Sequence, residues 1–350
     1  MAEQINLKDY EIILKIGEGS SGIVYKARDI TDKIVTVKQI KNSSKINENE
    51  YKRAINEINI LNDLNGYDNF VNLIDIETDE NNLYIIYEYN EYSISDLIHR
   101  NFDMTLEQIK FCFKTMLKSI ETLNYKGYIH RDIKPDNFLI TSKNEIKLID
   151  FSLSVRFDDE FENDKAYMVG TYGYMAPEVL LGSTDCGIEI DIWSLGCTLY
   201  ELLTHEKLIK VVWDETEIAK QMIEIFGFPT KEDFPLFDTF QNKELFTECG
   251  AHQITTLEEI LDRKLKDEYK IFKPLLIGML QMNPKSRLSI SEILEDPIFA
   301  DTESIENLPQ ITINECNKRF CAKKKKNRMF DLLEELRPSK ITPMMDIIDC

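Results

Sequence analysis

Residues 130–152, HRDIKPDNFLITSKNEIKLIDFS, constrain the fold more than any other stretch of the chain. Two apolar runs, Phe138–Ile140 and Ile146–Ile149, flank the turn-forming residues Ser142–Asn144, and this pattern predicts a β-hairpin. A strongly polar segment comes before the first run, and a single aspartate follows the second. The hairpin would therefore bring these two polar positions next to each other.

The polar positions at the open end of this hairpin carry oxygen atoms that suit a metal ion. Asp132 and Asn137 precede the first strand, and Asp150 follows the second. Carboxylate and amide oxygens are ligands that Mg²⁺ prefers, and the ion often shares them with substrate phosphates. The alternative interpretation is a polar hairpin turn without a chemical role.

Composition places the chain among soluble globular proteins. Hydrophobic residues make up 43 % of it and charged residues 30 %. Its 350 residues exceed the length that one hydrophobic core usually supports, so we expect two lobes or subdomains. No apolar run approaches the ~18 residues of a membrane helix, and the start MAEQINLKDY lacks a signal-peptide pattern. We therefore expect no membrane partner.

Charge and cysteine content narrow the classes of partner and compartment. The formal net charge of −20 argues against nucleic-acid binding and favours basic partners or substrates, although solubility alone also accounts for it. Seven scattered cysteines without a CxxC pair predict reduced thiols, and hence a cytoplasmic or nuclear protein. The four histidines lack the spacing of metal ligands.

Residues 10–90 show the pattern of a strand-rich lobe with one helix. Two β-patterned runs surround a turn in which Gly17, Gly19 and Gly22 would let the backbone approach phosphate groups, with an ordinary hairpin as the alternative. A helix carrying Glu57 is predicted from apolar residues at helical spacing, namely Ala54, Ile58, Leu61 and Leu64. A second helix, leading into the polar loop, is predicted from Ile109, Phe113, Met116, Ile120 and Leu123.

These motifs resemble those of eukaryotic protein kinases. HRDIKPDN is similar to the catalytic loop H-R-D-L-x-x-x-N of that family, and DFS to its metal-binding motif D-F-G. The resemblance implies that Asp132 accepts or orients the proton of the substrate hydroxyl and that Lys134 neutralises charge on the phosphoryl group. It assigns Asn137 and Asp150 to Mg²⁺. The Lys-Pro pair after Ile133 resembles the serine/threonine-specific version.

The resemblance also implies an ATP site. Lys38 would contact the α- and β-phosphates and pair with Glu57, whose helix resembles the regulatory αC helix. Tyr87 corresponds to the gatekeeper position, and Glu88 and Asn90 would present backbone groups to adenine. The implied nucleotide-binding residues are Ile16, Gly17, Glu18, Gly19, Ser20, Ser21, Gly22, Val24, Lys38, Glu57, Tyr87, Glu88, Asn90 and Leu139.

Three later motifs follow in the order of the family. GTYGYMAPEVLL resembles the end of an activation segment, with Thr171 facing Asp132. DIWSLGCTLYELL resembles the central helix of the large lobe, with Asp191 tied to the catalytic loop. NPKSRLSISEIL supplies Arg287, the expected ion-pair partner of a buried Glu178.

We therefore predict an α+β protein, the bilobal kinase fold with a small β-rich N-lobe and a larger helical C-lobe. The expected parts are an N-terminal extension (1–9), the N-lobe (10–90), the C-lobe (91–299) and a tail (300–350). The αC helix or the tail is the expected place for a regulatory partner. Nuclear localisation, docking, or alternatively a solvated tail is predicted from the basic run Lys323, Lys324, Lys325, Lys326 and Arg328.

The predicted function is transfer of the γ-phosphate of Mg-ATP to serine or threonine hydroxyls of proteins. Two departures from the family pattern support a different class, a pseudokinase scaffold. Ser152 replaces the glycine of D-F-G, which would restrict backbone flips, and Thr36 replaces an alanine that touches adenine. A kinase of small molecules is a third alternative, disfavoured by the GTYGYMAPE segment.

The cues on subgroup and substrate conflict. The segment ELLTHEKLIKVVWDETEIAKQMIEIFGFPTKEDFP resembles the insert of cyclin-dependent and MAP kinases, but Met175 stands where their arginine for proline-directed substrates would be. Asp136 and Glu201 match positions that contact upstream arginines in basophilic kinases. Met168 and Met175 would line the pocket for the residue after the acceptor. We expect a mild preference for upstream basic and following apolar residues.

Activation has two candidate mechanisms. In resembling kinases the cation at Arg131 pairs with a phosphate of the activation loop. Between Ser154 and Thr171 the only hydroxyl belongs to Tyr167, which predicts tyrosine phosphorylation. The alternative, which we favour, is a fixed carboxylate on Arg131 that makes the loop active without modification. The acidic cluster that would supply it is Asp158, Asp159, Glu160, Glu162 and Asp164.

Overall fold

The computed structural model describes most of the chain. The described residues are 7–19, 22–41, 48–79, 82–157, 169–183, 186–210, 213–235, 237–302 and 308. The chain separates into two compact units, residues 1–306 and 307–350, and the architecture below is that of the first unit. The basic run of the tail lies outside the described residues.

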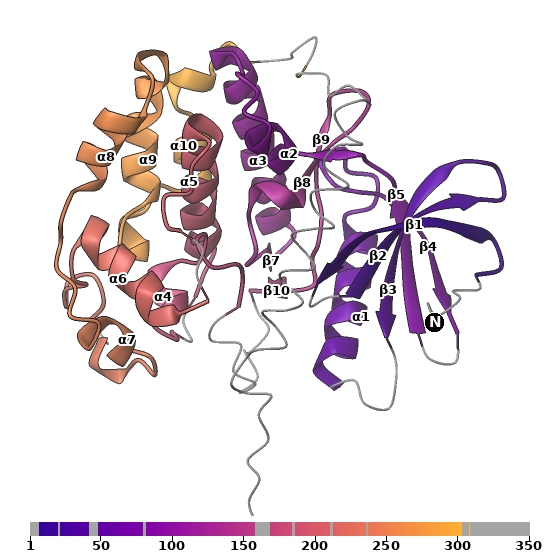
Figure 1. The fold of residues 1–350 in the computed structure, drawn as a ribbon, viewed down its shortest axis with the longest axis horizontal. Helices are drawn as coiled ribbons and strands as arrows, with labels where there is room; N and C mark the ends of the chain where they lie inside the picture. Colours follow the sequence, from indigo (N-terminus) through magenta and orange to yellow (C-terminus); the bar gives the residue numbers. More distant parts are fainter. Residues whose placement is uncertain are drawn as a thin grey trace, which may run out of the picture. The chain divides into compact units, whose positions relative to one another are not determined.

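An antiparallel sheet and one helix form the small lobe (Figure 1). Its elements are β1 (Tyr10–Gly19), β2 (Gly22–Asp29), β3 (Ile34–Lys41), α1 (Glu48–Asp63), β4 (Leu73–Thr78) and β5 (Asn82–Glu88). The strand order β1-β2-β3-β5-β4 places β3 at the centre, and Val35 and Val37 are fully buried on one of its faces. Because side chains alternate along a strand, Thr36 and Lys38 point to the opposite face.

Helix α1 buries the apolar stripe that its sequence predicts. Ala54, Ile58 and Leu61 are buried along the helix, and Leu64 is buried directly after it. Glu57 lies on the same face, because positions three and four apart share one side of a helix, and it is only 2 % exposed. A carboxylate in such surroundings requires a charged or hydrogen-bonding partner.

Helices make up most of the large lobe (Figure 1). They are α2 (Ile94–His99), α3 (Leu106–Tyr125), α4 (Pro177–Leu180), α5 (Glu189–Thr204), α6 (Glu215–Phe226), α7 (Glu244–Thr247), α8 (Leu257–Lys264), α9 (Lys273–Met279) and α10 (Ile290–Leu294). The predicted apolar face of α3 is buried from Ile109 to Leu123. Helix α5 is buried on nearly every side, which makes it the central helix of this lobe.

The predicted hairpin is confirmed. Strands β8 (Phe138–Ile140) and β9 (Ile146–Leu148) pair antiparallel, and the turn closes with a bond of 2.9 Å from Thr141 N to Glu145 O. The short strand β6 (Tyr92–Ser93) pairs with β8, and β7 (Tyr128–Ile129) pairs with β10 (Val155–Arg156). At the open end Ile149 N donates to Asn137 O at 3.0 Å, which brings the exit of β9 beside the polar loop.

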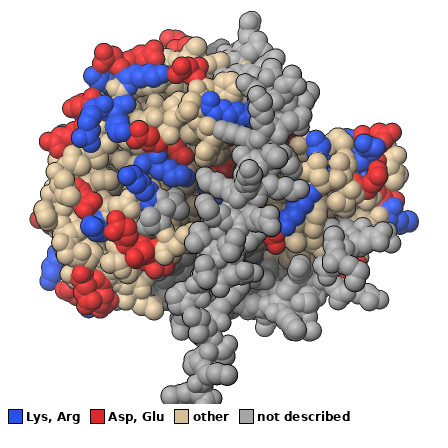
Figure 2. All heavy atoms as spheres, viewed as in Figure 1, with Lys and Arg blue, Asp and Glu red and all other residues tan. Residues whose placement is uncertain are grey.

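Charged side chains of both signs are interspersed over the face shown in Figure 2. Among the described residues, charged side chains also pair, as Lys264 does with Glu206 and Lys273 with Asp262, each at 2.6 Å. The acidic excess is therefore mixed with basic groups on this face, which agrees with its interpretation as a solubility feature. Among the described helices, none is long and apolar enough to cross a membrane.

Candidate active site

Asp132 is held by hydrogen bonds to both of its carboxylate oxygens. The Thr171 hydroxyl donates to Oδ1 at 2.6 Å, and Lys134 Nζ donates to Oδ2 at 2.6 Å. Lys134 Nζ also donates to Thr171 Oγ1 at 2.7 Å, and Asn137 Nδ2 donates to the Asp132 carbonyl at 2.8 Å. The structure therefore brings these predicted residues together and confirms that Thr171 faces Asp132.

A buried aspartate of α5 holds the backbone of the catalytic loop. The Asp191 carboxylate accepts the N–H of His130 at 2.8 Å and that of Arg131 at 2.9 Å. Burial raises the pKa of Asp191, against the lowering effect of these donors. Arg131 has a φ of 67°, a left-handed conformation that is costly for a residue other than glycine. The predicted tie is confirmed, and it stabilises a strained part of the loop.

The imidazole of His130 connects the catalytic loop to the metal-binding motif. Its Nδ1 accepts the N–H of Asp132 at 3.2 Å, so the ring proton is assigned to Nε2, which donates to Ile149 O at 3.1 Å. The ring also lies edge-on to the fully buried Phe151, with 5.4 Å between centroids. This one ring therefore connects the loop of Asp132 to the strand that leads to Asp150.

Lys38 lies between two carboxylates from different parts of the chain. Its Nζ is 2.8 Å from Glu57 Oε2 on α1 and 3.1 Å from Asp150 Oδ1. Burial acts to lower the pKa of Lys38, but the charges of Asp150 and Glu57 outweigh it and hold the pKa above its ordinary value. The ammonium is therefore charged, as phosphate binding requires. The predicted pair of Lys38 and Glu57 is confirmed.

Asp150 is the open member of this cluster. Its side chain is 28 % exposed, whereas those of Lys38 and Glu57 are each 3 % exposed. Burial acts to raise the pKa of Asp150, but the charge of Lys38 and a hydrogen bond from the Ser152 hydroxyl hold it below its ordinary value. The carboxylate is therefore ionised and reachable by a ligand.

The oxygen atoms of Asn137 and Asp150 fit a shared Mg²⁺. Asn137 uses its amide N–H on Asp132, which leaves its carbonyl oxygen for a metal. In the part of the chain that the structure describes, no three His, Cys, Asp or Glu residues cluster so as to hold a metal by themselves. An incomplete set of hard oxygen donors suits Mg²⁺, which completes its coordination with phosphates and water.

The glycine-rich turn contains one glycine that the sheet itself requires. Gly22 has a φ of +129°, and a Cβ there would lie 2.4 Å from the carbonyl oxygen of Gln39. At Gly19 no atom lies within 4 Å of such a Cβ. Gly22 therefore serves the close approach of β2 to β3, and Gly19 is the open position for a phosphate. The predicted contacts Ser20 and Ser21 lie outside the described residues.

Strand register aligns the other predicted contacts of β1 and β2 with Lys38. Gly17 lies opposite Val24, and Val24 lies opposite Lys38. Ile16 and Glu18 flank Gly17 on β1. These residues share one region of the sheet, as a roof over a nucleotide requires, and their individual roles stay predictions.

The gatekeeper position lies across the sheet from one of the unusual residues. Tyr87 on β5 pairs with Thr36 on β3, so their side chains share a face of the sheet. Burial raises the pKa of Tyr87, whose hydroxyl is therefore neutral. The departure at Thr36 thus adds a small polar group beside a bulky neutral ring and displaces none of the charged residues.

Two predicted adenine contacts after the gatekeeper, Glu88 and Asn90, differ in their hydrogen bonds. The Glu88 N–H donates to the carbonyl of Asn72 at 3.2 Å and is therefore not available to adenine. Nδ2 of Asn90 is buried without a hydrogen-bond partner. Such an unpaired buried donor is costly. The predicted role of Asn90, which is to present backbone groups to adenine, stays a prediction. Leu139, on β8, is partly exposed.

Two residues that matter to the site were missed by sequence analysis. Gly170 has a φ of +115°, and a Cβ there would lie 2.8 Å from the carbonyl oxygen of Arg131. Its lack of a side chain lets the activation segment reach the catalytic loop, and its place directly before Thr171 was the available signal. Asn56 of α1 donates through Nδ2 to Ser154 O at 2.7 Å, which no sequence pattern indicated.

A second buried ion pair lies within the large lobe. Arg287 Nη1 and Nη2 donate to the two carboxylate oxygens of Glu178 at 2.5 and 2.7 Å. The Nε of Arg287 donates to Gln281 O at 2.9 Å, and the guanidinium lies 5.1 Å from the ring centroid of Trp193. This two-point pair confirms the prediction for Glu178.

Arg131 forms no ion pair with any carboxylate in the described part of the chain. Its Nε donates to Leu153 O at 2.6 Å. Burial, and then the charge of Arg53 on α1, lower the pKa of Arg131 to about 10. Two neighbouring cations favour an anion beside them, as both activation mechanisms require. Tyr167 and the acidic cluster lie outside the described residues, so the choice between the mechanisms stays open.

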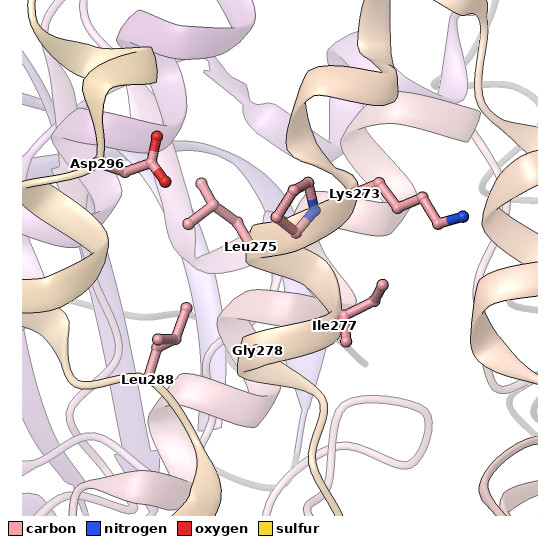
Figure 3. A pocket seen from close by; sticks show the side chains of 7 residues that line it. Lys273, Leu275, Ile277, Gly278, Leu288 and Asp296 are labelled. Atoms are coloured by element: carbon pink, nitrogen blue, oxygen red, sulfur yellow. The ribbon is translucent and has the colours of Figure 1, made fainter.

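An apolar hollow of about 590 Å³ in the large lobe is separate from these groups. In Figure 3, Leu275 of α9 and Leu288 before α10 project into it. Its lining residues are Lys273, Pro274, Leu275, Ile277, Gly278, Leu288 and Asp296. None of them belongs to the clusters around Asp132 or Lys38, so the hollow is not the nucleotide site.

Known proteins share this arrangement. Residues 10–299 match the protein kinase domain. The chain is 31 % identical over 310 residues to serine/threonine-protein kinase ppk23 of Schizosaccharomyces pombe, covering 85 % of this chain and 74 % of the relative. It is 33 % identical over 300 residues to cell division control protein 2 homolog 1 of Trypanosoma brucei brucei, covering 83 % and 98 %. It spans only 44 % and 45 % of two further relatives.

A solved structure gives the same result. The crystal structure of the yeast RNA Pol II CTD kinase CTDK-1 complex contains a chain that matches with a TM-score of 0.73 and 26 % identity. The match covers 89 % of this chain and 99 % of that one.

The chain belongs to the protein kinase family, and the predicted bilobal α+β fold is confirmed. Within the family it is a serine/threonine protein kinase with features of the cyclin-dependent and MAP kinase group. Enzymes of this family act on proteins and use ATP with Mg²⁺.

Proposed function

We propose that this chain transfers the γ-phosphate of ATP to serine or threonine hydroxyls of proteins, with Asp132 as the catalytic base. The observation that carries the proposal is the assembled state of the site. Lys38 bridges Glu57 and Asp150, while Asp132 is bonded to Lys134. Positioning and electrostatics supply most of the catalysis in such reactions, and both require these groups to be in place together.

On the nucleotide side, Lys38 and the glycine-rich turn bind the phosphates. Glu57 orients the ammonium of Lys38 and keeps it charged. Asn137 and Asp150 would hold Mg²⁺, which when bound neutralises charge on the phosphates.

On the acceptor side, Asp132 orients the substrate hydroxyl and takes up its proton. Lys134, bonded to both Asp132 and Thr171, lies where it would contact the phosphoryl group. Thr171 is a positioning residue, because its hydroxyl accepts from Lys134 and donates to Asp132. The base therefore keeps its orientation before the substrate arrives.

A scaffold without catalysis is the second candidate function, because Ser152 departs from the glycine of the family's D-F-G motif. Ser152 is not among the described residues with positive φ, so the backbone seen here does not require glycine at that position. Asp150 retains its contacts with Lys38 beside it. The serine therefore leaves the charged groups of the site intact.

Transfer of labelled γ-phosphate to a generic basic protein distinguishes the candidates. The wild-type chain should label the protein, and Asp132→Asn should lose about 10²- to 10⁴-fold in rate while remaining folded. A scaffold would label nothing in either form. A kinase of small molecules would consume ATP only with another acceptor.

We extend the proposal to partners and compartment. A cyclin-like regulatory subunit on α1 or the tail is supported by the similarity to a chain of the CTDK-1 complex. A cytoplasmic or nuclear location is supported by the free thiols of Cys112, Cys197 and Cys249 in the described part of the chain. Basic protein substrates are supported by the net charge of −20.

A further inference from the structure

A buried acidic group near the catalytic loop already has a cation from this chain. Glu201 of α5 is 3 % exposed, and its Oε2 accepts the Tyr174 hydroxyl. Lys207 Nζ lies 3.7 Å from Glu201 Oε1, donates to the Tyr174 hydroxyl, and sits 4.3 Å from the centroid of that ring. Lys207 is therefore held by a carboxylate, a hydroxyl and an aromatic face at once.

This cluster lies next to the place where an acceptor hydroxyl must bind. Tyr174 N donates to the carbonyl of Thr171 at 3.1 Å, and Thr171 is bonded to Asp132. Burial and then the charges of Glu201 and Asp136 raise the pKa of Tyr174. Tyr174 thus connects the buried Glu201 to the segment that carries Thr171, and on charge alone a carboxylate there would select a basic substrate.

We propose that Lys207 takes the place of a substrate arginine at Glu201 and thereby removes selection for a basic residue before the acceptor. This inference rests on the proposed function, because a substrate must reach Asp132. It replaces the sequence-based expectation that Glu201 contacts upstream arginines.

An incoming arginine gains little at this position. One carboxylate oxygen of Glu201 accepts from Tyr174 and the other faces Lys207, so the two-point contact that a guanidinium prefers is blocked. The side chain of Lys207 is 31 % exposed, whereas that of Glu201 is 4 % exposed. The arginine would therefore meet the partly exposed ammonium before the buried carboxylate, and these like charges repel.

The test measures peptide binding to the full chain and to Lys207→Met, which keeps a long apolar side chain on Tyr174 but removes the charge. The peptides carry alanine at the acceptor and either arginine or alanine at successive positions before it. Binding is followed by calorimetry with Mg²⁺ and a non-hydrolysable ATP analogue. Lys220→Met is the matched control, because this lysine of α6 pairs with Glu217 at 3.6 Å.

Wild type and Lys220→Met should bind the arginine and alanine peptides alike, whereas Lys207→Met should favour arginine at one position by about tenfold. Adding Glu201→Gln to Lys207→Met should abolish that preference. Lys207→Gln, which keeps a donor to Tyr174, is measured in parallel in case the methionine variant does not fold.

An arginine preference in wild type, or none in a folded Lys207 variant, would overturn the proposal. Binding needs no turnover. If the wild-type chain shows no phosphotransfer, that finding counts against the proposed function. The peptide-binding result still tests the role of Lys207 independently.

Discussion

Two of the buried ion pairs in the described part of this kinase have the same charges but different surroundings. Lys38 and Glu57 connect β3 to α1, and a third charged group, Asp150, lies 3.1 Å from the lysine. Arg287 and Glu178 form a balanced pair whose side chains are 0 % and 3 % exposed. The remaining donors of Arg287 go to backbone carbonyls, including that of Glu189 at 2.8 Å.

The difference shows how a buried pair acquires a chemical role. The cluster at Lys38 has two carboxylates for one cation, and its third member is 28 % exposed. It has an excess negative charge that a metal ion can neutralise. The pair at Arg287 has no such excess and is closed to solvent, so it serves the fold. The Lys38 cluster and the pair of Arg287 and Glu178 therefore differ in net charge and in exposure to solvent, more than in the burial of their paired side chains.

The largest effect is expected from Lys38→Met. This change removes the cation that lies between Glu57 and Asp150, and with it the predicted phosphate contact, so phosphotransfer should fall by about 10²-fold or more. Thermal unfolding of the same sample shows whether the fold survives. Turnover near that of wild type would show that the Lys38 cluster has only a structural role, like the pair of Arg287 and Glu178.

Arg287→Met should act on stability instead. It leaves Glu178 buried without a partner, which costs about 3–5 kcal/mol in the free energy of unfolding. Urea denaturation measures this loss. Arg287→Met combined with Glu178→Gln is the control, and it should recover part of the stability because no charge remains buried. A double variant as unstable as the single one would show that packing, not charge, is responsible.

Ser152→Gly tests whether the serine restricts the backbone next to Asp150. The variant loses the hydroxyl that bonds Asp150 and gains backbone freedom, so a flipped, inactive arrangement should be populated more often. Inhibitors selective for that arrangement should bind up to about tenfold more tightly. Equal affinity for the two proteins would remove any conformational role of the serine.

The smallest effect is expected at Tyr167. The half-buried guanidinium of Arg131 forms no ion pair with a described carboxylate, and we favour the acidic cluster of residues 158–164 as its counterion. Phosphatase treatment and Tyr167→Phe should then both leave activity unchanged, while replacing the acidic residues by amides should reduce it. Loss of activity after both treatments would instead establish the tyrosine phosphate.

Motif spacing predicted contacts between distant residues because the motifs carry family information. The pair of Lys38 and Glu57 and the pair of Glu178 and Arg287 were both anticipated in this way and are both present. The hairpin after the catalytic loop followed from local physics alone, since two short apolar runs and a turn can pair in few ways.

Other features depend on packing that leaves no local pattern. Gly170 is defined by how closely the activation segment approaches Arg131, and Lys207 by its distance from Glu201 on the preceding helix. Neither residue belongs to a periodic run. Gly22 was predicted for phosphate binding, but the carbonyl of Gln39 already demands it. The sequence therefore indicated that glycine at position 22 matters, but it did not indicate the close contact that requires glycine there.

One paired measurement tests the central claim that the open cluster carries the chemistry and the closed pair carries the fold. Phosphotransfer per folded molecule and the free energy of unfolding are determined on the same samples of Lys38→Met and Arg287→Met. We predict that Lys38→Met loses transfer with little change in unfolding, and that Arg287→Met loses stability while its folded fraction stays active. A folded but inactive Arg287→Met beside an active Lys38→Met would contradict the account.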